Sequence, residues 1–382
     1  MNAMKKILTL MVIGSVLIFT GCEKDDTVET LDKEDAVQTL EKNDEELKAS
    51  LKEIESTEGM QAIQTLEGLT QKDDPFSDET KSGGGEIIIE NLQKVLRPTD
   101  NKQLKREGSY PFDFDNWVGT YEWQDTKEWN VKREDPDDQI IIKFPTDTTQ
   151  ESPENNAVLT LTDYSEFETT DSLGNTVYVA DTVKMTLEID GKEVLNVDYA
   201  LDYDNELDAV QSLEATVYLK PFTWELSMSE EKVEAALINE NNGNVLVSFS
   251  FEITFRDNME DAEKLNGYVQ LHNLRLDGGI KPYNLQRLED ETFLVENELT
   301  SFDDMVEYVN EQIDISLYKA DTGNKIADMK VILDEESEDD IPVQPILVFE
   351  DGSEEPAGQY FENVSNYIKS ILETYNLEKS KI

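Results

Sequence analysis

The side chains of this sequence that could carry out chemistry are almost all carboxylates. The 382 residues include 85 Asp and Glu, 33 Lys and Arg, one histidine and one cysteine. A pair of carboxylates hydrolyses a glycosidic bond when a dry pocket raises the pKa of the acid. Among 85 acids no pair stands out, so an acid-type glycoside hydrolase is an alternative to which we assign no residues.

Histidine and cysteine chemistry is nearly excluded by the counts. His272, in a segment that we expect to be a strand, has no Gly-x-Ser-x-Gly elbow to serve as the base of a serine triad. One cysteine and one histidine build neither a disulfide nor a Cys/His zinc site. We therefore predict no catalytic residue, no metal site and no cofactor, and we expect a protein that is not an enzyme.

Aromatic side chains offer a different kind of site. Trp117, Tyr121 and Trp123 share one face of a predicted strand, and Trp129 follows closely. Such a platform can stack on sugar rings, and packing of the rings in the core is the alternative. We take these four residues as candidate ligand-binding residues.

The N-terminus has the pattern of an export signal. Two lysines precede Ile7–Thr20, an uncharged and largely apolar run of 14 residues that is too short to span a bilayer. The run ends in Phe19-Thr20-Gly21-Cys22, which resembles the lipobox of bacterial lipoproteins, with Phe19 in place of the usual Leu. The resemblance implies a signal peptide at residues 1–21 and a lipid on Cys22. Two or three acyl chains anchor a protein stably to a membrane.

The residues after Cys22 indicate a destination. Lys24-Asp25-Asp26 resembles the export tag of Bacteroidota lipoproteins. The resemblance implies display on the outside of the outer membrane, with an inward-facing lipoprotein as the alternative.

The charge restricts the partners. The chain carries a net charge of −52, and removal of residues 1–21 leaves 31 basic against 85 acidic residues, a net charge of −54. This charge repels phosphate backbones and anionic headgroups, so we exclude nucleic acid as a partner. Glycans, lipids and envelope proteins remain as partners, and the sequence does not predict the oligomeric state.

The elements fall into four regions after the signal peptide. Thr27–Thr70 has an apolar heptad stripe, no proline and no glycine before Gly59, which predicts a helical stalk over residues 22–70 that either packs on the chain or pairs with a partner helix. Residues 71–85 form an acidic, Gly-rich linker. Residues 86–290 form an antiparallel β domain, and residues 291–382 form a small α+β region.

The β domain is predicted from strict alternation. In Val245–Arg256, Val, Phe and Ile occupy one face and, from Ser248 onward, polar residues occupy the other, and Asp190-Gly191 and Asn242-Gly243 mark two-residue hairpins. The fold class is therefore mainly β or α+β, with an antiparallel meander sheet. The sheet has to cover its apolar face, and an open sheet, a sandwich and a half-barrel all satisfy this requirement.

Part of this domain resembles a group of uncharacterised Bacteroidota lipoproteins. The resemblance covers residues 112–255 and depends on Gly119–Trp123, Trp129, Ile141–Pro145, Asn156–Thr162 and Lys220–Trp224. It implies a β-rich, lipid-anchored protein and no particular activity.

The sequence thus predicts a surface-exposed, non-enzymatic lipoprotein that binds a glycan or an envelope protein. A carrier of lipid or another hydrophobic ligand, with a half-barrel cavity, is the alternative. The glycoside hydrolase comes third.

Overall fold

The computed structural model describes residues 29–70, 105–107, 114–124, 128–133, 135–149, 153–170, 176–204, 209–229, 231–255, 262–333 and 343–360. The chain is mainly β, and its sheet is mixed, mostly antiparallel and open, which confirms the predicted fold class. The predicted lipid-attachment residue Cys22, the export-tag residues Lys24, Asp25 and Asp26, and the linker 71–85 lie outside the described residues.

The chain divides into two compact units. Unit 1 consists of Met1–Leu51, Glu231–Ala236 and Asn244–Ile382, and unit 2 consists of Lys52–Glu230 and Leu237–Gly243. These units do not coincide with the boundaries expected after residues 70, 85 and 290. The helical region 22–70 is divided between the units, and the region after residue 290 continues the unit 1 sheet by backbone pairing with it.

Unit 2 is a sheet with one long helix and a short 3-10 turn. Its helical elements are α3 (Glu58–Thr70) and η1 (Phe114–Asn116). Its strands are β1 (Lys105–Glu107), β2 (Gly119–Trp123), β3 (Trp129–Arg133), β4 (Ile140–Phe144), β5 (Ala157–Thr170), β6 (Thr176–Ile189), β7 (Lys192–Asp204), β8 (Ala209–Leu219) and β9 (Phe222–Ser229).

The strands of unit 2 pair mostly with their neighbours in sequence. From β4 to β9 each strand is antiparallel to the next, as a meander predicts. Two strands depart from this order: β1 is antiparallel to β6, and β2 is parallel to β4 as well as antiparallel to β3. Asp190 and Gly191 connect β6 to β7 with φ angles of 51° and 71°, the positive values that a two-residue hairpin favours.

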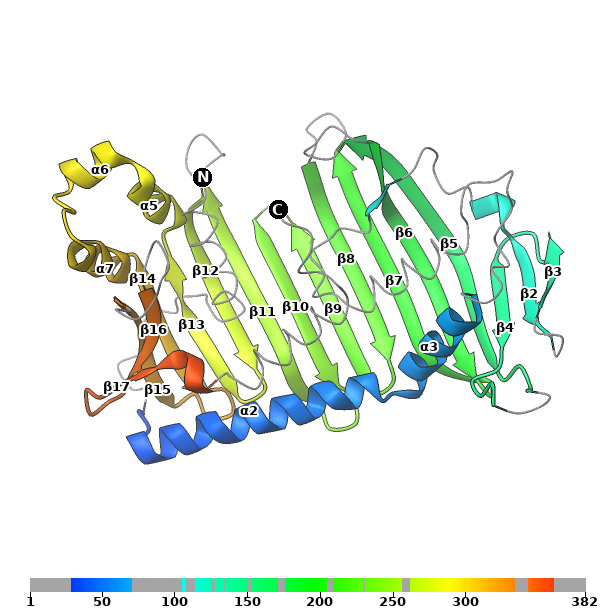
Figure 1. The fold of residues 1–382 in the computed structure, drawn as a ribbon, viewed down its shortest axis with the longest axis horizontal. Helices are drawn as coiled ribbons and strands as arrows, with labels where there is room; N and C mark the ends of the chain where they lie inside the picture. Colours follow the sequence, from blue (N-terminus) through cyan, green and yellow to red (C-terminus); the bar gives the residue numbers. More distant parts are fainter. Residues whose placement is uncertain are drawn as a thin grey trace. The chain divides into compact units, whose positions relative to one another are not determined.

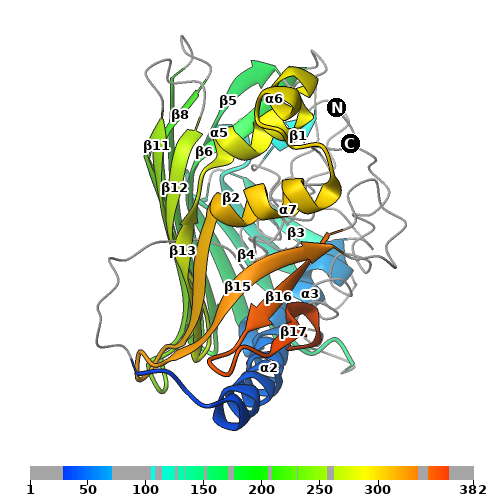
Figure 2. The ribbon, with the colours of Figure 1, turned by 90° about the vertical axis from the view of Figure 1, so that its left-hand side faces the viewer.

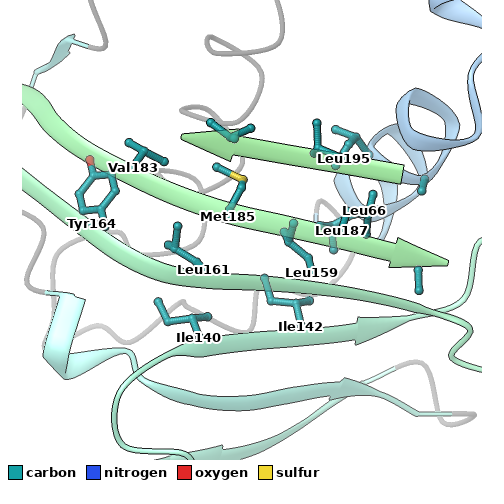
Figure 3. Packing of buried hydrophobic residues seen from close by; sticks show 14 of the residues in the cluster. Leu66, Ile140, Ile142, Leu159, Leu161, Tyr164, Val183, Met185, Leu187 and Leu195 are labelled. Carbon is teal, nitrogen blue, oxygen red and sulfur yellow. The ribbon is translucent and has the colours of Figure 1, made fainter. Parts of the chain in front are cut away.

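The core of unit 2 lies between one face of this sheet and α3. Alternate residues of β4, β5 and β6, among them Ile142, Leu159 and Leu187, point to the face on which Leu66 of α3 packs (Figure 3). Close approach of α3 requires Gly59, because a Cβ there would lie 2.5 Å from Leu219 Cδ1 and 3.2 Å from the Val194 carbonyl oxygen. The predicted stalk is therefore, in this part, a packed core helix.

Unit 1 contains the rest of the strands and most of the helices. Its helical elements are α2 (Lys33–Glu55, with the residues up to Leu51 in this unit), α5 (Pro282–Gln286), η2 (Arg287–Glu289), α6 (Glu291–Glu296), α7 (Phe302–Glu311) and η3 (Ala357–Tyr360). Its strands are β10 (Lys232–Asn239, with the residues up to Ala236 in this unit), β11 (Asn244–Phe255), β12 (Ala262–Leu271), β13 (Leu274–Ile280), β14 (Ile313–Lys319), β15 (Lys325–Leu333), β16 (Val343–Val348) and β17 (Glu354–Pro356).

The sheet of unit 1 is antiparallel from β11 to β17, and helices α5 to α7 lie on one side of β11, β12 and β13 (Figure 2). The register aligns Val269, Leu276 and Leu317 on one face, where all three are buried. On β11 the burial differs from the expected pattern. Leu246 and Ser248, on the face expected to be wet, are buried, whereas Phe249 and Phe251 are only half-buried.

Truncation of Leu66 tests the core of unit 2. We expect Leu66→Ala to lower the free energy of unfolding by about 2–5 kcal/mol, because the side chain is fully buried and its loss leaves a cavity. Chemical denaturation of the full chain measures the change. Gln64→Ala, at an exposed position of the same helix, serves as the control, and equal effects of the two variants would contradict this packing.

Candidate functional site

The structure places three of the four predicted aromatic ligand residues in the core of unit 2. The exposed fractions of Trp117, Tyr121 and Trp123 are 2%, 0% and 6%. Trp129 is half-buried, and its ring meets that of Trp123 edge to face, with 5.2 Å between the ring centroids. The three buried rings present no surface to a sugar, so the arrangement supports core packing over a binding platform.

A hydrogen-bonded arginine covers this aromatic cluster. The Tyr121 hydroxyl donates to the Trp117 carbonyl oxygen and accepts from Arg133 Nη1, both at 2.6 Å. The Arg133 guanidinium lies 4.4 Å from the centroid of the Trp117 ring, a cation–π distance. Burial raises the pKa of Tyr121 to about 12, and the charge of Arg133 opposes part of this rise.

The pKa of Tyr121 predicts a loss of stability at alkaline pH. A tyrosine titrates near pH 10 in the unfolded chain, so the neutral hydroxyl stabilises the fold fully below pH 10, and this contribution is lost as the pH rises to about 12. We expect Tyr121→Phe to reduce the loss of unfolding free energy between pH 10 and pH 12 by about 2 kcal/mol. Denaturation at several pH values measures the slope, and an unchanged slope would contradict the assignment.

The structure reveals a different candidate site in unit 1, which we call the polar cleft. It has a volume of about 290 Å³ and lies where α2 meets the turns between β12 and β13 and between β14 and β15. Figure 1 shows α2 running along the ends of the unit 1 strands. The cleft is lined by Gln38, Thr39, Lys42, Asn43, Glu46, Asn273, Lys319 and Asp321.

Helix α2 is fixed at the cleft by apolar and backbone contacts. Its inward side buries Ala36, Leu40 and Leu47. The segment before it pairs with the first residue of β15: Leu31 N donates to the Lys325 carbonyl oxygen at 2.8 Å, and Lys325 N donates to that of Glu29 at 2.9 Å. The wall of the cleft that α2 forms is therefore attached to the sheet both just before the start of the helix and along its length.

Two asparagines join the walls. Asn43 is 3% exposed, and its Oδ1 accepts from the backbone N–H of Asn273 at 2.7 Å. The Asn273 Oδ1 accepts from the N–H of Asp321 at 2.9 Å, and its carbonyl oxygen accepts from Ala320 N at 2.8 Å. This chain of neutral hydrogen bonds runs from the helix through one turn to the next and sets the spacing of the walls.

The histidine lies beside the cleft and corrects a prediction. His272 is not in a strand but in the turn between β12 and β13, at a φ of 52°. That left-handed conformation is uncommon for a residue with a side chain, although histidine adopts it more readily than most. The His272 Nδ1 lies 3.7 Å from Glu46 Oε2 and, in the described part of the chain, forms no hydrogen bond.

Four charged side chains give the cleft its electrostatic character. Lys42 Nζ lies 3.5 Å from Glu46 Oε1 on the helix, and Lys319 Nζ lies 3.5 Å from Asp321 Oδ2 on the turn side. The two positive and two negative charges balance within the cleft, although the chain as a whole carries −52. The cleft thus offers both donors and acceptors of hydrogen bonds, in neutral and in charged form.

Sequence reasoning missed this cleft. Its residues come from segments that lie far apart in the sequence, at 38–46, at 273 and at 319–321. One local signal was present: Asn43 and Asp44 interrupt the apolar stripe of the helix, yet both are buried. A buried amide in an apolar stripe needs a hydrogen-bond partner, which here is the turn.

Other classes of site receive no support from the described ranges. They contain no group of three or more His, Cys, Asp or Glu side chains that could hold a metal ion. No helix within these ranges has the length and apolar character needed to cross a membrane. Comparison of the chain with known protein families, curated proteins and solved structures found no match. The function is therefore argued from the polar cleft and the sequence.

Proposed function

We propose that the chain is a non-enzymatic lipoprotein, held on the outer surface of a bacterial outer membrane by a lipid on Cys22, that binds a glycan through the polar cleft. The observation that carries the proposal is the lining of the cleft, in which every residue is polar. Binding sites for most small molecules are largely apolar. A lining made up of hydrogen-bonding side chains suits a ligand that carries many hydroxyl groups.

The arrangement of the lining supports such a ligand. Gln38 supplies an amide at the cleft, and Thr39 supplies a hydroxyl whose hydrogen is donated to the Asp35 carbonyl oxygen, so its lone pairs face other donors. Lys319 and Asp321 add a charged donor and a charged acceptor, which form the stronger kind of hydrogen bond. No aromatic ring lines the cleft, so binding rests on hydrogen bonds instead of stacking.

The N-terminal sequence supports the anchor. Cys22 ends the apolar run after Thr20 and Gly21, and Lys24-Asp25-Asp26 follows it. Many copies held in one membrane bind a repeating glycan with far higher avidity than one copy does. An anchored protein can thus function with a shallow site of modest affinity.

One observation favours a second candidate, the hydrophobic-ligand carrier. Phe249 and Phe251 of β11 stack with 5.1 Å between their ring centroids, and both are only half-buried. Half-buried rings on a sheet face suit an acyl chain. The glycan proposal is preferred because the polar cleft is a shaped volume with convergent groups.

The anchor is tested by metabolic labelling. We expect the full chain, expressed in a lipoprotein-processing bacterium, to incorporate radiolabelled palmitate and to lose residues 1–21. Cys22→Ala should incorporate none, because it lacks the thiol that carries the diacylglycerol. A protein that incorporates no label although it is expressed and exported would contradict the anchor.

Glycan binding is tested by filling the cleft. Gln38 lines the cleft and is exposed, so we expect Gln38→Trp to fold and to block any ligand, with at least a tenfold loss of binding on a glycan array. Gln64→Trp makes the same exchange at an exposed position of α3 and is the matched control. An array on which the unmodified full chain binds nothing, or on which both variants bind as it does, would overturn the proposal.

A further inference from the structure

We infer that the polar cleft selects a saccharide that carries both an ammonium group and a carboxylate. This inference rests on the proposed glycan binding and narrows it to one chemical class. It comes from the placement of charge in the cleft, where each wall holds one lysine and one acid: Lys42 and Glu46 on α2, and Lys319 and Asp321 on the turn between β14 and β15.

The two lysine–acid ion pairs of the cleft are loose. Both have nitrogen–oxygen distances of 3.5 Å. Elsewhere in the unit, Arg275 and Asp277 form two hydrogen bonds of 2.8 and 3.0 Å. Lys325 and Asp328 lie 2.7 Å apart, and Lys232 and Glu234 lie 2.9 Å apart. A long, exposed ion pair contributes little, so a ligand can replace it at small cost.

The fold does not depend on these four charges. The spacing of the walls is set by the neutral hydrogen bonds of Asn43 and Asn273, and the contribution of Asp321 to that chain comes from its backbone N–H. Helix α2 is held by its apolar face and by the pairing of Leu31 with Lys325. The charged side chains are therefore free to exchange partners when a ligand enters.

A ligand of a single charge sign is disfavoured. An anion that contacts Lys42 and Lys319 brings its charge close to Glu46 and Asp321, and the overall charge of −52 also repels it. A cation that contacts the two acids meets the two lysines in the same way. A neutral saccharide leaves both ion pairs as they are and gains only neutral hydrogen bonds.

A zwitterionic saccharide matches both signs of charge in the cleft. Its carboxylate pairs with a lysine of one wall, and its ammonium pairs with an acid of the other. Hydrogen bonds between charged groups are stronger than those between neutral groups. The remaining hydroxyls meet Gln38 and Thr39, as in the proposed function.

Calorimetry of the full chain in phosphatidylcholine vesicles tests the inference with four matched probes. They are an oligosaccharide of alternating glucosamine and glucuronate, its N-acetylated form, its carboxyl-reduced form, and the form with both changes. We expect the zwitterionic probe to bind at least tenfold more tightly than each derivative at low salt, with a smaller difference at high salt. Equal affinity for all four probes would overturn the inference and leave glycan binding intact. If no probe bound and the glycan array were also blank, the proposed function would fall as well.

Charge-neutral variants provide the sharper test. Of Glu46→Gln and Asp321→Asn, the variant of the acid that holds the ammonium should lose the preference for the free amine and keep the preference for the carboxylate. Of Lys42→Gln and Lys319→Gln, the variant on the opposite wall should do the reverse. The control is Asp198→Asn in unit 2, which breaks an equally loose pair with Lys184, 4.0 Å apart, and should keep both preferences. A uniform loss of affinity in all four cleft variants, without this crossed pattern, would overturn the assignment of charges.

Discussion

One constraint underlies the packing of the described helices: a strand that alternates apolar and polar residues gives the sheet an apolar face that water must not reach. In unit 2 the face formed by β4 to β8 is covered by α3 and by the rings of Trp117, Tyr121 and Trp123. In unit 1 the helices α5 to α7 lie on one side of the sheet, and α2 buries Ala36, Leu40 and Leu47. Covering these faces leaves the turns at the strand ends as the places where polar groups converge.

The same constraint explains why most of the β structure was predictable. Alternation of apolar and polar residues over ten or more positions, as in β6, β7 and β11, predicts a β-strand. The turn Asp190-Gly191 has positive φ angles, which these two residue types adopt readily. The capping box of α7, in which Ser301 and Asp304 exchange hydrogen bonds, is equally local. Features that depend on a few neighbouring residues can be predicted from the sequence, because the interactions that stabilise them form within one turn or one pair of strands.

The features that could not be predicted depend on contacts between residues that lie far apart in the sequence. Helices α5 and α6 have five and six residues, too few to establish a helical period. The aromatic residues Trp117, Tyr121 and Trp123 were identified, but the side chain that covers them, Arg133 on β3, became visible only from the pairing of β2 with β3. His272 was assigned to a strand because the residues around it alternate, whereas it lies in a turn whose Asn273 N–H donates a hydrogen bond to the distant Asn43 Oδ1. The cleft depends most strongly on such distant contacts, because its lining residues come from three separate segments, at 38–46, at 273 and at 319–321.

The electrostatics of the molecule act on two length scales. Ions screen charges over about 8 Å at physiological salt, so the net charge of −52 decides what approaches the molecule, whereas contacts of a few ångströms decide what binds. The cleft holds two lysines and two acids, whereas the chain as a whole has 85 acids and 33 basic residues. Because the charges of the cleft balance, a ligand carboxylate inside it does not meet the repulsion that the acidic surface exerts elsewhere. A ligand with both signs is then attracted by its positive end at long range and held by both ends at short range.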